Sequence, residues 1–154
     1  MQVDYSKLRF SERDKQIYGL TILDNPYIVY KPFPKQAAAI MHPSQQKLLG
    51  GNAYSGKSLL GSMIASQWLM YPNYRCLILR RTYDDVVATG GIVDYLKRFL
   101  LDYDRLGEHT CELNEAKKVF TAPSGAKIYY NYSQRKGDKE KFRGRSYHTI
   151  IWDE

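Results

Sequence analysis

The eight residues from Gly51 to Ser58 constrain the fold most. They match the pattern G-x-x-x-x-G-K-[ST] in full. In this pattern a glycine-rich loop follows a strand and opens a helix, so backbone N–H groups and the helix dipole converge on phosphate oxygens. Lys57 supplies a positive charge for the β- and γ-phosphates, and Ser58 supplies a hydroxyl for Mg²⁺. We therefore expect the triphosphate of a bound nucleotide to be wrapped by Gly51, Asn52, Ala53, Tyr54, Ser55, Gly56, Lys57 and Ser58.

The residues around this loop have strand and helix patterns in the required order. Gln46–Gly50 is a short apolar run that predicts a buried strand, and Ser58–Met70 has apolar residues at helical spacing. Further strands are predicted at Arg75–Leu79 and Thr149–Trp152, a hairpin at Val119–Ala122 and Lys127–Tyr132, and helices at Gln36–Met41, Asp84–Val87 and Ile92–Leu101. This alternation predicts an α/β fold with a mostly parallel sheet flanked by helices and one antiparallel hairpin. Together with the phosphate-loop motif, it resembles the P-loop NTPase class (ASCE or RecA-like).

Composition and charge limit the classes of function. The chain has 154 residues, which suits one modest domain, and its net charge of +7 favours polyanionic partners. Residues 133–145 hold six Arg or Lys against two acids, as an exposed loop or a segment facing nucleic acid would. No apolar run approaches the roughly 18 residues of a membrane span. Cys76 and Cys111 give no disulfide framework, so we expect a cytosolic protein.

An acidic pair, Asp153 and Glu154, follows the last apolar strand, 96 residues beyond Lys57. Alone, such a pair is typical of an exposed loop. Together with the phosphate loop, it predicts that Asp153 reaches Mg²⁺ through water and that Glu154 polarises the attacking water. Positioning supplies most of such catalysis, so the base needs no unusual pKa. The chain has no guanine-reading Asn-Lys-x-Asp, which favours ATP over GTP.

Gln36 is a candidate for base recognition. It lies 21 residues before Lys57, and its amide matches the N6 and N7 edge of adenine, with Tyr30 or Phe33 available for stacking. The alternative is that these residues only open a helix after a proline-rich linker. Arginines near strand ends, which are Arg80, Arg81, Arg143 and Arg145, are either surface ion-pair partners or an arginine finger. Arg143 is our first choice for the finger.

In this order, these residues resemble the large terminase subunit, the DNA-packaging ATPase of tailed bacteriophages. The resemblance covers about residues 30–154 and depends on Pro34–Gln36, Gly50–Ser58, Cys76–Thr82 and Phe142–Glu154. It implies that residues 31–154 are a partial P-loop ATPase domain that ends at the Walker B strand. Residues 1–30 have scattered aromatic and charged residues without a sustained period, so we expect them to form an N-terminal arm.

The resemblance also implies a function and partners. The protein would be an ATP- and Mg²⁺-dependent motor that moves viral double-stranded DNA in the cytoplasm of an infected bacterium. It would act as a homo-oligomeric ring, with portal and small terminase subunits as partners and no membrane. Gln36 would contact adenine, Asp153 would help to hold Mg²⁺, Glu154 would activate water, and Arg143 would act on a neighbouring subunit's site.

One departure from the family is the lack of its nuclease domain and of the motif that couples hydrolysis to movement. In ATPases with this strand order, the next strand lies between the phosphate-loop strand and the Asp153 strand. We therefore expect a piece of a longer polypeptide, with two unpaired strand edges, that binds ATP weakly and hydrolyses it poorly alone.

Two other interpretations stay open at this point. A superfamily-2 helicase-like translocase shares the upstream glutamine, the phosphate loop and the Asp-Glu strand. A non-catalytic nucleotide- or nucleic-acid-binding fragment of such an ATPase is also compatible with the charge of +7.

Overall fold

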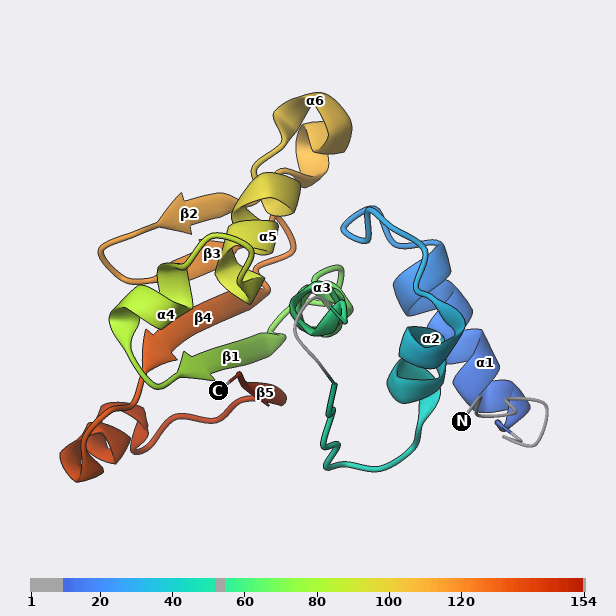
Figure 1. Cartoon of the computed structure of the whole chain (residues 1–154). Coiled ribbons are helices and arrows are strands. Elements are labelled where there is room, and N and C mark those ends of the chain that lie inside the picture. The colour runs from blue at the N-terminus through green and yellow to red at the C-terminus, as the bar shows by residue number, and fades with distance from the viewer. Residues whose placement is uncertain (1–9, 52–54, 154) are drawn as a thin grey trace.

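A mixed five-stranded sheet organises the protein, seen in the computed structural model of Figure 1, which describes residues 10–51 and 55–153. The strand order is β2 (Glu112–Asn114), β3 (Val119–Thr121), β4 (Lys127–Tyr132), β1 (Arg75–Arg80) and β5 (Thr149–Trp152). β1 pairs in parallel with β4 and β5, whereas β3 pairs antiparallel with β2 and β4. The α/β class and the hairpin are confirmed. The sheet is mixed rather than mostly parallel, because β2 adds a second antiparallel pairing.

Short helices connect and flank these strands. They are α1 (Glu12–Tyr18), the π-helix η2 (Gly19–Leu23), α2 (Pro34–Met41), α3 (Lys57–Ser66), α4 (Tyr83–Val87), α5 (Ile92–Leu100), α6 (Tyr103–Leu106), and the 3₁₀ segments η3 (Gly107–His109) and η4 (Lys136–Phe142). The helix predicted over Ser58–Met70 is present, but it ends at Ser66. Beyond it, turns closed by Leu69 N–H to Ser66 and Tyr71 N–H to Trp68 bring Leu69 into the core.

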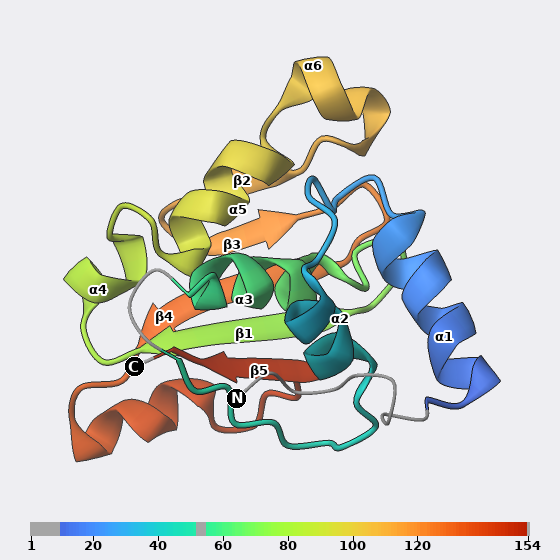
Figure 2. The same cartoon turned by 45° about the vertical axis from the view of Figure 1, so that its right-hand side comes forward.

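The main core lies between the sheet and the helices α3, α4 and α5, which cover the same face in both views (Figures 1 and 2). Strand side chains alternate between the two faces, so Cys76 and Ile78 of β1 point into this core together with Ile128 of β4. From the helices, Val86, Val93, Leu96 and Leu100 complete it. This packing fixes α3 against β1 and β5, which is the arrangement that positions the candidate site.

The described part of the predicted N-terminal arm packs on α3. Ile22 of η2, Ile40 of α2 and Leu60 of α3 form a second, smaller cluster of buried side chains. A polar contact joins η2 to the residue that follows α3, because the Gln67 side chain donates to Thr21 Oγ1 at 2.8 Å. Residues 10–30 therefore help to hold α3, and α1 and α2 lie side by side beyond it (Figures 1 and 2).

The strand predicted at Gln46–Gly50 is wrong. These residues form an irregular, exposed segment in which the Leu48 side chain is 100% exposed. A strand needs a neighbour for its backbone hydrogen bonds, and in the described part of the chain this segment has none. β5, the nearest edge of the sheet, pairs only with β1 among the described residues. Of the two unpaired edges that were expected, the one on the Asp153 strand is present, because β5 has no second neighbour among the described residues. The other was expected on the phosphate-loop strand, which does not form there.

Candidate functional site

The end of the predicted phosphate loop is held by Gln36. Gly56, the residue before α3, has a left-handed φ of 79°, which favours glycine. Its carbonyl accepts a hydrogen bond from Gln36 Nε2 at 3.2 Å, while Gln36 Oε1 accepts one from the Phe33 backbone N–H at 2.9 Å. The buried Gln36 amide thus ties the start of α2 to the start of α3. One amide hydrogen and one oxygen lone pair are left for a further partner.

Lys57 and Ser58 open α3, as the motif predicts. The first N–H groups of a helix have no partner within it, so this end of α3 is suited to anions. The Lys57 ammonium group donates to the Gly51 carbonyl at the other end of the loop. Ser55 approaches Gly51 so closely that a Cβ on Gly51 would lie 2.7 Å from Ser55 Oγ. Asn52, Ala53 and Tyr54 lie outside the described residues.

Asp153 follows β5 directly. Its backbone N–H donates to the Leu79 carbonyl at 2.9 Å, which continues the β1–β5 pairing by one residue. Its Oδ2 accepts a hydrogen bond from Arg80 Nε at 2.8 Å. The side chains of both residues are mostly buried, with 19% and 22% exposed. Glu154, the predicted base, lies outside the described residues.

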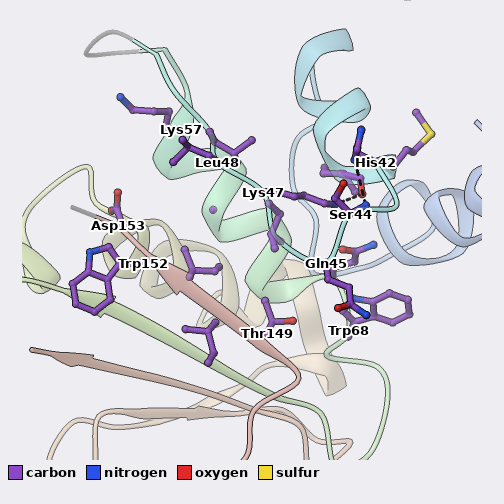
Figure 3. Close-up of a pocket in the computed structure, with 18 of the residues that line it drawn as sticks. His42, Ser44, Gln45, Lys47, Leu48, Lys57, Trp68, Thr149, Trp152 and Asp153 are labelled. Atoms are coloured by element: carbon purple, nitrogen blue, oxygen red, sulfur yellow. Dashed lines mark hydrogen bonds between the residues drawn. The ribbon is translucent and has the colours of Figure 1, made fainter. Parts of the chain in front are cut away.

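One cavity joins these parts. Lys57 and Ser58 of α3 and Asp153 line the same space of about 750 Å³, which extends between α3, β5 and residues 40–49. Figure 3 shows Lys57 and Asp153 at one end of it, with Thr149 and Trp68 further along. Its volume lies within the range of roughly 300–1,000 Å³ that is typical of ligand sites. Lys57 and Ser58 at the end of the motif and the Asp153 carboxylate, which are far apart in the sequence, therefore line one cavity.

The donor set fits a magnesium nucleotide. Mg²⁺ prefers oxygen ligands, and it is usually bound by one or two carboxylates together with substrate phosphates. The Ser58 hydroxyl and the Asp153 carboxylate supply such oxygens on two walls of the cavity. Within residues 10–51 and 55–153, three or more His, Cys, Asp or Glu side chains do not cluster as a metal cage would require.

Other candidates lie away from the cavity. Arg143 follows η4, its side chain is 82% exposed, and it pairs with Glu140 at 3.2 Å. Tyr30 packs edge-on against Phe99 of α5 with ring centroids 5.7 Å apart, and it does not line the cavity. Phe33 is exposed beside the start of α2.

The cysteines are buried components of the core. Burial raises the pKa of both thiols, Cys76 and Cys111, to about 12. Both are free thiols, in keeping with the expectation of no disulfide framework. As for membranes, the helices of the described chain are too short or too polar to cross one.

A comparison with protein families identifies the family of the chain. Residues 48–154, more than half of the chain, match the family model described as terminase large subunit, T4likevirus-type, N-terminal. The chain belongs to the terminase large subunit family. This is a family of phage DNA-packaging ATPases, so the resemblance noted from the motifs is confirmed and the helicase-like alternative is not supported. No curated protein and no solved structure matches this terminase chain.

Proposed function

We propose that this chain is the ATP-hydrolysing part of a motor that packages viral double-stranded DNA. Two observations support the proposal together: the family match, and the cavity that is lined both by Lys57 and Ser58 of α3 and by Asp153, which follows β5. Of these, the shared cavity carries the argument for catalysis, since a phosphate loop without a facing carboxylate would only bind.

Each residue has a defined role in this proposal. Gly51–Ser58 wraps the triphosphate, Lys57 neutralises phosphate charge, and Ser58 and Asp153 hold Mg²⁺. A bound magnesium nucleotide supplies the transferable γ-phosphate and neutralises part of its charge. Glu154, one residue after Asp153, orients the attacking water.

Two further residues complete the proposed ATPase site. Gln36 uses its remaining amide hydrogen and lone pair on the adenine edge. Arg143 is exposed and outside the cavity, as a residue acting on a neighbouring subunit in a ring would be. We propose double-stranded DNA, the portal and the small terminase subunit as partners, in the cytoplasm of the infected bacterium.

Phosphate release with ATP and Mg²⁺ tests the catalytic part. Lys57→Ala and Asp153→Asn are each expected to lower the rate by roughly 10²-fold or more. The first removes the positive charge at the phosphates, and the second removes the negative charge that helps to hold Mg²⁺. Lys97→Ala on α5 and Asp104→Asn on α6 are matched controls outside the cavity and leave the rate unchanged. A measurable wild-type rate that Lys57→Ala and Asp153→Asn both retain would contradict the proposal.

The remaining alternative is a non-catalytic nucleic-acid-binding fragment. DNA binding measured over a range of salt, with and without a non-hydrolysable ATP analogue, separates the two. A motor part couples its two ligands, so the analogue changes DNA affinity. A passive module binds DNA with the same affinity and salt slope in both conditions.

A further inference from the structure

Arg80 contacts the proposed magnesium ligand, and the sheet explains why. In the parallel pairing of β1 with β5, Leu79 lies opposite Trp152, so the next residues along are neighbours: Arg80, the last residue of β1, and Asp153, which follows β5. Their side chains meet at 2.8 Å, between Arg80 Nε and Asp153 Oδ2. Only about a fifth of each side chain is exposed. The contact is thus partly shielded from water, unlike the exposed Arg143–Glu140 pair.

The other end of the guanidinium group is also held. Arg80 Nη1 donates to the backbone carbonyl of Asp85 in α4 at 2.9 Å. That turn is itself closed at its start, since Asp85 N–H donates to Thr82 Oγ1 at 3.2 Å and Thr82 Oγ1 donates to Asp85 Oδ2 at 2.6 Å. Arg80 therefore bridges the end of β5 and a capped helix, and its planar fork has little freedom to turn.

The contact occupies one carboxylate oxygen and leaves the other. Asp153 Oδ2 accepts the bond from Arg80, whereas Oδ1 takes no hydrogen bond from the residues that the structure describes. Asp153 lines the cavity that Lys57 and Ser58 also line. Metal-binding carboxylates are commonly oriented by a hydrogen bond to the oxygen that the metal does not use, and loss of such a partner typically costs roughly 10–100-fold in metal affinity.

We infer that Arg80 is the positioning residue for Asp153: it holds Oδ2 and so presents Oδ1 to the magnesium ion of the nucleotide. This inference depends on the proposed function, because it assigns a task to Arg80 in the same site. Arg80 touches neither nucleotide nor metal in this role. Its removal therefore lowers the effect of Mg²⁺ on nucleotide binding and leaves metal-free binding through the phosphate loop unchanged.

A fluorescent ADP derivative titrated into the 154-residue chain tests this, once over a range of MgCl₂ concentrations and once in EDTA. Mg²⁺ is expected to increase the affinity of the chain for the ADP derivative. For Arg80→Gln, half of this increase should require a MgCl₂ concentration roughly 10–100-fold higher than for the wild type, whereas the affinity in EDTA should stay unchanged. Arg75→Gln is the matched control, because it removes the same charge from the exposed first residue of β1. Arg80→Lys should recover only part of the effect, since an ammonium group lacks the planar fork that reaches both partners.

Two comparisons separate a positioning role from a merely structural one. Asp153→Asn should weaken the magnesium effect by itself, and adding Arg80→Gln to it should change the effect little further, because both act through one carboxylate. Urea unfolding of the wild type, Arg80→Gln, Asp153→Asn and the double variant measures the stability that the ion pair contributes without any nucleotide. Unfolding midpoints that shift additively would show that the pair is absent in solution, and this would overturn the inference.

The outcomes distinguish the inference from the function on which it rests. Wild-type chain that binds no nucleotide in either buffer would overturn the proposed function, and the role of Arg80 with it. Nucleotide binding with a normal magnesium effect in Arg80→Gln would overturn the role of Arg80 alone. A stronger magnesium effect in Arg80→Gln would also overturn it, because Arg80 would then compete with the metal.

Discussion

Replacing Gly56 by alanine tests how the end of the phosphate loop is held. Gly56 has a φ of 79°, where an L-residue is strained by roughly 1–2 kcal/mol. A Cβ there would also lie 2.9 Å from Gln36 Nε2. The Gln36 side chain can move away only by giving up its hydrogen bond to the Gly56 carbonyl, which contributes about 1 kcal/mol. We therefore expect Gly56→Ala to lower the free energy of unfolding by about 2–3 kcal/mol.

Gly90 provides the matched control for this variant. Its φ is 77°, nearly the same, but nothing lies within 4 Å of the Cβ that alanine would add. Gly90→Ala should therefore cost only the backbone strain, about 1–2 kcal/mol. Urea unfolding followed by circular dichroism measures both, and the difference of about 1 kcal/mol isolates the contact with Gln36.

A double variant makes the test sharper. In a Gln36→Ala background the added Cβ meets no amide, so Gly56→Ala should cost no more than Gly90→Ala does. If Gly56→Ala and Gly90→Ala cost the same in the wild-type background, Gln36 does not hold the loop and the reasoning fails.

Three further predictions concern groups away from the loop. Hydrogen bonds, the strongest of them from the Arg135 backbone N–H, lower the pKa of Asp138 to about 2. The ionised carboxylate should therefore stabilise the η4 turn fully above about pH 4, and this stabilisation should be lost as the pH falls through 2. An NMR titration of the Asp138 carboxyl group with a midpoint near pH 4 would contradict this. Because burial raises the pKa of the Cys76 and Cys111 thiols to about 12, both should react with Ellman's reagent at pH 8 roughly 10³-fold more slowly in the folded chain than in urea. Comparable rates in the two conditions would show that the thiols are accessible in the folded chain. Leu96→Ala should lower the free energy of unfolding by about 2–5 kcal/mol in a urea titration, because Leu96 of α5 is fully buried in the main core. A decrease of less than about 1 kcal/mol would place Leu96 outside the core.

The elements that could be predicted from the sequence are those with a strong local pattern. The helical spacing of apolar residues in α5 and α3, and the apolar run of β1, each mark an element whose buried face is fixed by its own residues. β2 has no such pattern, because Glu112 and Asn114 are polar and only Leu113 faces inward. It is a strand because β3 lies beside it, and a single sequence does not reveal that neighbour.

The strand wrongly predicted at Gln46–Gly50 also depends on a neighbouring strand, which is missing in this case. Its apolar residues satisfy the pattern for a buried strand, yet an apolar run forms a strand only when a neighbouring strand accepts its backbone hydrogen bonds. In the described chain, a cavity rather than a strand separates this segment from β5. Leu48 is exposed as a result, and the prediction failed on pairing rather than on composition.

Local sequence patterns predict some residues of the candidate site but not the contacts between them. Lys57, Ser58 and Asp153 could be predicted as candidates from the sequence, because each belongs to a recognisable loop or follows a recognisable strand, and all three line one cavity. The contact of Arg80 with Asp153 depends instead on the register between two parallel strands whose residues are 73 positions apart. A register shifted by one residue would turn one of the two side chains to the opposite face of the sheet. The alignment of β1 with β5 therefore decides whether Arg80 can contact the Asp153 carboxylate. In the proposed site, a change in that alignment would alter magnesium binding even with every loop residue intact.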